Sequence, residues 1–165
     1  MNIHDMLKTH EFFRDLSSGD LKLICDCALL QFFERGDKIA HTGNSADFFY
    51  VIQSGRLSIS VEMGGRGSRE IQSLGEGEVV GWSWIFPPYR WSFDVSALEP
   101  TSVISFEGAC VRSKCEQDPR LGYELMKRFA QVLSQRLRLT RLQLAQGPAK
   151  AVFQDNRNLI TENPS

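Results

Sequence analysis

The sequence has no long apolar run and no excess of charge of either sign. Its 165 residues contain no stretch approaching the roughly 20 apolar residues that a membrane-spanning helix needs. Its 19 Lys and Arg residues nearly balance 20 Asp and Glu residues, which argues against a surface built as a whole for nucleic acid or anionic lipid. The N-terminus lacks a basic segment followed by an apolar one, so we expect no signal peptide and a cytoplasmic location.

Motifs for catalysis or metal binding are also scarce. Only His41 of the three histidines lies in the β-rich region, whereas a cupin-like metalloenzyme needs two or three histidines that converge with a carboxylate. No Ser-His-Asp set, paired-carboxylate motif or phosphate-binding P-loop is present. We therefore predict a protein that is not an enzyme, with no metal and no certain cofactor, and keep the cupin-like metalloenzyme as the least favoured alternative.

The four cysteines are too few and too irregularly spaced to indicate a disulfide framework. Cys25 and Cys27 stand two positions apart on a predicted helix, where side chains point to different faces. Cys110 and Cys115 also diverge if their segment is helical. We expect four reduced thiols that pack as small hydrophobic residues, not ligands of a metal or an iron–sulfur cluster.

The hydrophobic pattern changes twice along the chain. Helical spacing over the first 30 residues predicts short helices, with Ser17 and Ser18 as candidate N-caps and Phe12 and Phe13 as anchors to the body of the domain. From Ala28 to Phe106, short segments rich in Phe, Val, Ile and Tyr alternate with glycine-bearing turns. This pattern predicts an α+β, mainly β fold with an eight-stranded antiparallel roll, its strands within 28–34, 37–42, 47–53, 56–62, 69–74, 78–82, 91–98 and 101–106.

A long helix is predicted over 118–146, with Asp118 as N-cap, Pro119 at its first position and Gly147-Pro148 after it. Its apolar residues form two adjacent seams, which favours one face on the roll and another on a second copy of the chain. The alternative is one wide face on its own domain. The seam predicted to form a homodimer follows a strict 4-3 spacing: Met126, Ala130, Leu133, Leu137, Thr140 and Leu144.

The order of short helices, glycine-punctuated roll and long helix resembles the cyclic nucleotide-binding domain family, as in the sensory domains of Crp–Fnr-like proteins. GDKIAHTGNSADFFYVIQSGRLSISV looks like the family's first half, and GEGEVVGW looks like the run into its phosphate-binding cassette. The resemblance covers about residues 5–146. It implies a regulatory domain in which a ligand in the roll shifts the hinge at 107–118 and moves the long helix.

The cassette departs from that pattern. In the family, a Gly-Glu pair opens it, the Glu accepts a hydrogen bond from the ribose 2′-hydroxyl, and an Arg some ten residues later pairs with the cyclic phosphate. Gly81 is present, but Trp82 stands at the position of the Glu, and an indole has no useful acceptor. Arg90 lies at or one residue before the phosphate-binding position, which counting back from Ala97 assigns to Trp91.

Six aromatic residues fall within twelve positions of this cassette, including all three tryptophans. The rings either line a pocket for a flat or cationic ligand or fill the space that a nucleotide would occupy. The candidate ligand-binding residues are Gly81, Trp82, Ser83, Trp84, Tyr89, Arg90, Trp91 and Ser92.

We therefore predict a domain that senses a small or nucleotide-like molecule, other than cAMP or cGMP, and signals through its C-terminal helix to a protein partner. A true cAMP or cGMP binder that uses Arg90, and a ligand-free interaction or dimerisation module, remain as alternatives. Residues 147–165 form a polar tail too short for a helix-turn-helix domain, so we expect no direct DNA binding and no membrane contact.

Overall fold

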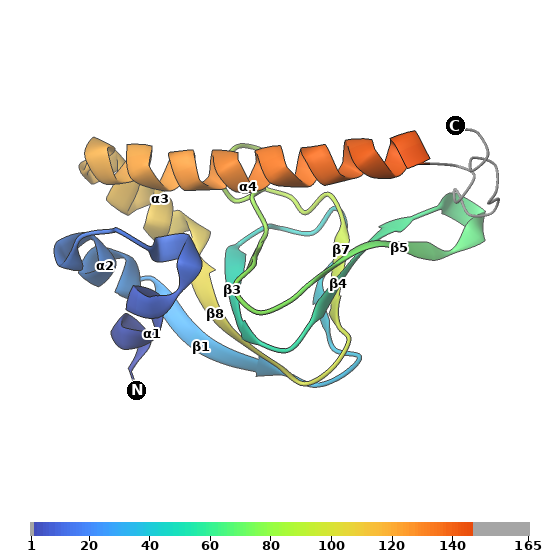
Figure 1. The fold of residues 1–165 in the computed structure, drawn as a ribbon, viewed down its shortest axis with the longest axis horizontal. Helices are drawn as coiled ribbons and strands as arrows, with labels where there is room; N and C mark the ends of the chain where they lie inside the picture. Colours follow the sequence, from blue (N-terminus) through green and yellow to red (C-terminus); the bar gives the residue numbers. More distant parts are fainter. Residues whose placement is uncertain (1, 147–165) are drawn as a thin grey trace. The chain divides into compact units, whose positions relative to one another are not determined.

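The computed structural model describes residues 2–146, which divide into two units, one ending at Glu124 and one beginning at Leu125. The first unit holds the N-terminal helices, eight strands, helix α3 and the start of helix α4 (Figure 1). The remainder of α4 belongs to the second unit. This order of elements confirms the predicted fold class.

Two α-helices and a 3-10 turn open the chain: α1 (Ile3–Thr9), η1 (Glu11–Phe13) and α2 (Ser18–Cys25). The side chain of Asn2 accepts a hydrogen bond from the Asp5 backbone N–H at 2.9 Å and so caps α1. Ser17, one of the two predicted caps, accepts from the Asp20 backbone N–H at 3.1 Å. These caps satisfy backbone donors that the first turn of a helix leaves without a partner.

Within residues 2–146, eight strands form two antiparallel sheets of four, in the orders β1-β8-β3-β6 and β2-β7-β4-β5. All eight predicted segments contain a strand, because β-branched and aromatic residues favour the pleated backbone and the glycines between them allow tight turns. The strands are β1 (Ala28–Phe33), β2 (Lys38–Ala40), β3 (Phe48–Ser54), β4 (Leu57–Glu62), β5 (Ser68–Leu74), β6 (Val79–Val80), β7 (Asp94–Ala97) and β8 (Thr101–Glu107).

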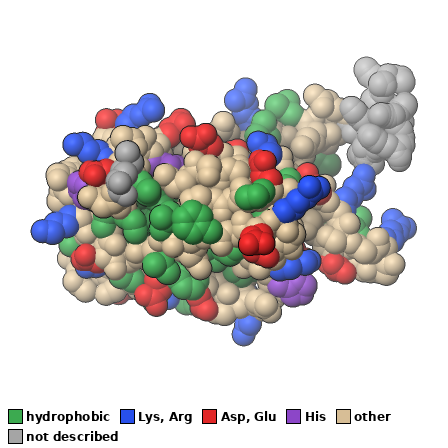
Figure 2. All heavy atoms as spheres, turned by 90° about the horizontal axis from the view of Figure 1, so that it is seen from below, with side chains coloured by type: hydrophobic (Ala, Val, Ile, Leu, Met, Phe, Trp, Pro, Cys, Tyr) green, Lys and Arg blue, Asp and Glu red, His purple; other side chains and the backbone are tan. Residues whose placement is uncertain are grey.

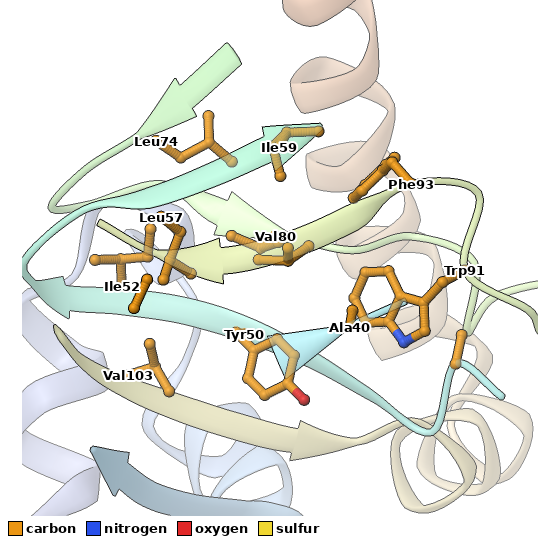
Figure 3. Packing of buried hydrophobic residues seen from close by; sticks show 13 residues of the cluster. Ala40, Tyr50, Ile52, Leu57, Ile59, Leu74, Val80, Trp91, Phe93 and Val103 are labelled. Atoms are coloured by element: carbon orange, nitrogen blue, oxygen red, sulfur yellow. The ribbon is translucent and has the colours of Figure 1, made fainter. Parts of the chain in front are cut away.

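The main hydrophobic core lies between the two sheets. Leu57 and Ile59 of β4 contribute from one sheet, and Ile52 of β3 and Val103 of β8 contribute from the other (Figure 3). All four are at most 3 % exposed, and burying a side chain of this size contributes roughly 1.5–3 kcal/mol. Leu57 and Ile59, two positions apart on β4, share the face that points into this core.

Two helices follow the roll. Helix α3 (Gly108–Gln117) starts directly after β8, and α4 (Pro119–Gln146) runs for 28 residues. The Asp118 carboxylate accepts from the Leu121 backbone N–H at 3.3 Å, as its predicted cap position requires. In the second unit, Leu137 is 51 % and Leu144 71 % exposed. Dimerisation through this seam stays a prediction, and the predicted tail at 147–165 lies outside the described residues.

The surface carries charges of both signs. Acidic and basic side chains are interspersed on the face shown in Figure 2, in keeping with the near-neutral composition. Within residues 2–146, no helix is both long and apolar enough to cross a bilayer.

The prediction of four reduced cysteines is wrong for one pair, since Cys27 and Cys110 form a disulfide. Helix α2 ends at Cys25, so Cys27 lies beyond it, and the argument from helix faces does not apply. Strand β1 pairs with β8 in a register that places Ala28 opposite Phe106, so Cys27 and the first turn of α3 become neighbours. Cys25 and Cys115 are free thiols.

A buried carboxylate at the start of β7 binds the chain just after the neighbouring strand β2. Asp94, 4 % exposed, accepts hydrogen bonds from the Thr42 backbone N–H at 2.7 Å and from the Thr42 hydroxyl at 2.9 Å. These bonds, the backbone bond foremost, lower the pKa of Asp94 from its ordinary value. Because its pKa is lower in the folded chain, ionised Asp94 stabilises the fold above the unfolded pKa, and this contribution is lost as the pH falls through the folded pKa.

We expect Asp94→Ala to lower the free energy of unfolding by roughly 1–3 kcal/mol at neutral pH, because it removes both hydrogen bonds that the buried carboxylate accepts from Thr42. Urea denaturation at a series of pH values checks this expectation. The difference from the native chain should shrink below pH 3.8, the ordinary pKa of an Asp side chain. Glu99→Ala, at an exposed position, is the control, and a difference for Asp94→Ala that is constant with pH would contradict the account.

Candidate functional site

The cassette between β6 and β7 runs alongside the loop that connects β2 to β3. The backbone N–H of Trp91 donates to the Asn44 carbonyl at 2.9 Å, and the Trp91 carbonyl accepts from the Gly43 N–H at 2.8 Å. The Ala46 N–H also donates to the Tyr89 carbonyl at 2.7 Å. These bonds hold the second half of the cassette in an extended path and fix which side chains enter the roll.

Trp91 is the residue that points into the roll. Its side chain is 5 % exposed and belongs to the core between the sheets, beside Ala40, Tyr50 and Phe93 (Figure 3). Its ring centroid lies 6.3 Å from that of Tyr50 in a stacked arrangement and 5.8 Å from that of Phe93 in an edge contact. Burial raises the pKa of Tyr50 to about 12, so this phenol stays neutral. The roll interior at the cassette is therefore filled with aromatic rings.

The ring of Trp91 fits because residue 81 has no side chain. Gly81 has a φ of +100°, a conformation that L side chains rarely adopt. A Cβ atom built on Gly81 would lie 2.7 Å from Cη2 of Trp91, closer than van der Waals contact allows. The glycine that the sequence pattern keeps at the head of the cassette thus provides room for the indole.

Arg90 points the other way. Its guanidinium Nη1 donates to the Gly43 carbonyl at 2.8 Å on the exposed surface. Arg90 also forms a backbone bridge with Ser45, and Ser92 on the far side of Trp91 is exposed as well. The alternation of an extended segment therefore places Trp91 inside and its two neighbours outside.

Trp82 closes the same interior from the other end of the cassette. It is half-buried, packs against the core between the sheets, and its ring centroid lies 5.5 Å from that of Phe93. No acceptor for a ribose hydroxyl is present on this side chain, because the indole nitrogen only donates.

Trp84 lies on the opposite face of β3, among a second group of rings. It is 1 % exposed and stacks on Phe49 at 4.8 Å between centroids, and Phe49 stacks on Phe106 at 4.8 Å. Phe13 follows at 5.4 Å from Phe106, which confirms the prediction that this residue anchors the N-terminal helices. Successive residues of β3, Phe49 and Tyr50, thus face different aromatic groups, and the cassette supplies a tryptophan to each.

Helix α3 is attached directly to the cassette. Arg112 donates from Nη1 to the Trp84 carbonyl at 2.5 Å, and its guanidinium carbon lies 4.1 Å from the centroid of the Tyr89 ring. Gly108, at the start of α3, packs so closely that a Cβ there would lie 2.8 Å from Cβ of Trp84. A shift of the cassette must therefore change the contacts that the first two turns of α3 make with it.

A cavity of about 360 Å³ opens where these elements meet. The β2–β3 loop contributes Asp47, the first residue of β3 contributes the ring of Phe48, and the cassette contributes Tyr89. Helix α3 and its preceding residue contribute Arg112 and Glu107. The cavity lies outside the roll, so Trp91 and Trp82 take no part in it. Within the described residues, no group of three or more His, Cys, Asp or Glu side chains is arranged to hold a metal.

Comparison with known proteins identifies the family. The family model of the cyclic nucleotide-binding domain matches residues 30–118, more than half of the chain. The chain belongs to the cyclic nucleotide-binding domain family.

Relatives of this chain include cGMP-dependent protein kinases. A cGMP-dependent protein kinase from Eimeria tenella is 26 % identical over 99 residues, which is 60 % of this chain and 9 % of the kinase. Isozyme 2 of the Drosophila melanogaster cGMP-dependent protein kinase is 30 % identical over 78 residues, 47 % of this chain and 8 % of that one. The chain thus spans about a tenth of the length of the kinases that it matches.

Solved structures agree with this assignment. A cyclic nucleotide-binding protein from Geobacter metallireducens GS-15 has a TM-score of 0.74 and 25 % identity, over 83 % of this chain and 99 % of that one. The sensor domain of the transcriptional regulator DNR from Pseudomonas aeruginosa has a TM-score of 0.64 at 18 % identity, over 81 % and 94 % of the two chains, and so shares the fold.

Within this family, the candidate residues predicted from the sequence fall into separate places. Trp82 and Trp91 both contact Phe93 in the core between the sheets. Trp84 stacks on Phe49 on the other face of β3, Ser83 is buried, and Tyr89 faces α3. Arg112 and Gly108 were missed, because a cation and a glycine in the predicted hinge at 107–118 carry no signal until α3 is placed against the cassette.

We expect Gly81→Ala to destabilise the domain more than Gly77→Ala. Both glycines have positive φ, +100° and +88°, so both substitutions carry the roughly 1–2 kcal/mol cost of a left-handed alanine. Only Gly81 faces a ring, whereas a Cβ on Gly77 would meet nothing within 4 Å. Overpacking should add about 1–3 kcal/mol at Gly81, measurable by urea denaturation.

The contact itself is tested by repeating both substitutions in a Trp91→Leu background. In that background, Gly81→Ala and Gly77→Ala should lower the free energy of unfolding by the same amount, because the indole that Gly81 faces is absent. If the two substitutions lower the free energy of unfolding equally in the native background as well, the Trp91 ring does not restrict the space at residue 81.

Proposed function

We propose that this chain is a non-enzymatic regulatory domain that binds neither cAMP nor cGMP inside its roll. The observation that supports this most directly is the burial of Trp91 against Gly81. A neutral indole cannot pair with a phosphate anion as a guanidinium does, and its ring takes up space that a ligand would need. Trp82 offers no acceptor to a ribose hydroxyl, and Arg90 is engaged outside the roll by the Gly43 carbonyl.

The proposed output runs through α3 into α4. Arg112 contacts the cassette at Trp84 and Tyr89, so a change in the cassette alters the contacts that hold α3. A ligand can shift such an element only if it interacts differently with its two positions. We propose that the exposed leucines of α4 pass the change to a protein partner or to a second copy of this chain.

The proposed site for a small ligand is the cavity between the cassette and α3. A molecule there would touch Tyr89 of the cassette and the start of α3 at the same time. Two carboxylates, Asp47 and Glu107, line the cavity, while the guanidinium of Arg112 is already held by the Trp84 carbonyl. This charge balance and the ring of Phe48 favour a ligand that carries a positively charged amine.

Isothermal titration calorimetry of the native chain with cAMP and with cGMP should show no saturable heat. The double variant Trp82→Glu, Trp91→Arg replaces both indoles by the groups that resemble the family's ribose and phosphate contacts. If circular dichroism shows it folded, it should gain saturable binding. Micromolar binding by the native chain, lost in Arg90→Ala, would overturn the proposal in favour of a true cyclic nucleotide binder.

Putrescine should raise the Tm of the native chain, whereas 1,4-butanediol, its neutral analogue, should not. A ligand at ten times its Kd stabilises the folded state by about 1.4 kcal/mol. Glu107→Gln should reduce the shift, and Glu99→Gln, an exposed control, should keep it. Equal effects of the two probes would contradict an amine site in this cavity and favour a ligand-free interaction module.

A further inference from the structure

The four cysteines gather at one junction of the fold. Cys25 ends α2, Cys27 immediately precedes β1, and Cys110 and Cys115 lie on α3. Cys27 and Cys110 are 83 residues apart in the sequence, yet their Cα atoms lie 5.6 Å apart and their sulfurs are bonded. The junction therefore joins the N-terminal helices, the edge of a sheet and the helix that follows the roll.

The disulfide ties a strand to the first turn of α3. On the strand side, the Cys27 carbonyl accepts the Glu107 backbone N–H at 3.0 Å, so Cys27 is fixed to the end of β8. On the helix side, Cys110 lies only two residues beyond Gly108, where α3 packs against the cassette. The bond thus holds in place the same helix end that Arg112 connects to Tyr89 and Trp84.

Without the covalent bond, α3 keeps weaker links to this junction. Lys114 forms an ion pair with Asp26 at 3.0 Å, and the Asp26 side chain is 60 % exposed, so solvent screens the attraction. Val111 is buried and holds one face of the helix by packing alone. On the side that faces β1, α3 is therefore held mainly by the disulfide, whereas Arg112 holds its cassette side.

We propose that Cys27–Cys110 is a redox site and that its oxidation state controls the attachment of α3 to the roll. The co-reactant is a small dithiol. One of its thiolates attacks the sulfur of Cys110, which is half-buried, whereas Cys27 is 7 % exposed. The protein S–S bond breaks, a mixed disulfide forms, and Cys27 leaves as a thiolate that takes up a proton.

The second thiol of the reductant then attacks the mixed disulfide and releases Cys110. Two electrons and two protons have passed from the dithiol to the protein, which holds two thiols, and the reductant has become a cyclic disulfide. Oxidised glutathione reverses the step by accepting two electrons and two protons to give two glutathione thiols. Cys25 and Cys115 do not compete, because burial raises the pKa of both thiols and so limits the reactive thiolate form.

The inference rests on the proposed function only in taking α3 as the output element. The redox state of Cys27–Cys110 acts on α3 without any ligand in the roll. A chain that bound cGMP and still showed the redox response would overturn the proposed function and leave this inference standing.

The test compares the full chain equilibrated with oxidised glutathione and with dithiothreitol. Alkylation of the native protein before and after unfolding, followed by intact mass, counts its thiols, and amide exchange by mass spectrometry follows 107–118. Dithiothreitol should open the bond in the folded protein, and exchange in α3 should then rise severalfold. Exchange in β5 should not change, because β5 pairs with β4 at the edge of the other sheet.

Two variants separate the pair from the other thiols. Cys110→Ser should show the fast α3 exchange in both conditions, and Cys115→Ser should respond as the native chain does. If Cys110→Ser does not fold, reduced native protein gives the same comparison. The inference is wrong if the bond resists dithiothreitol until the protein unfolds, if α3 exchange is equal in both states, or if four thiols persist in oxidised glutathione.

Discussion

Inside the roll, the indole of Trp91 packs against the backbone at Gly81, where the absence of a side chain leaves room for the ring. Tyr50, Phe93 and Trp82 close around it, so the sheets are held together by rings at the place where a ligand would otherwise contribute contacts. A domain built in this way has a complete core without a ligand. Membership of the family therefore accounts for the fold of this chain, whereas the residues of the cassette determine which ligand the fold can bind.

The two faces of β3 connect this core to the rest of the first unit. Tyr50 faces Trp91, and Phe49 faces Trp84, whose carbonyl accepts a hydrogen bond from Arg112 of α3. A change in the cassette and a change at the Cys27–Cys110 junction would thus reach the same helix from two sides. Under the proposed function, α3 remains the output element although Trp82 and Trp91 stand where the family has its ribose and phosphate contacts.

Much of the fold could be predicted from the sequence, because its signals are local. The strand segments between glycine-bearing turns, the Ser17 cap and the Asp118–Pro119 start of the long helix all depend on neighbours in the chain. The Cys27–Cys110 bond, the contact of Arg112 with Tyr89 and the separation of Trp84 from Trp91 depend on strand register and on which face of β3 each ring meets. No local pattern specifies those, and so the sequence left open whether the aromatic residues share one pocket.

The central claim, that Trp91 occupies the interior of the roll, is tested most directly by fluorine NMR of the chain labelled with 5-fluorotryptophan. The three tryptophans give three resonances, and the one that is missing from the spectrum of Trp91→Phe belongs to Trp91. The account predicts that this resonance changes little between H₂O and D₂O and does not move when cGMP is added. A solvent shift typical of an exposed indole, or a displacement that saturates with cGMP, would contradict it.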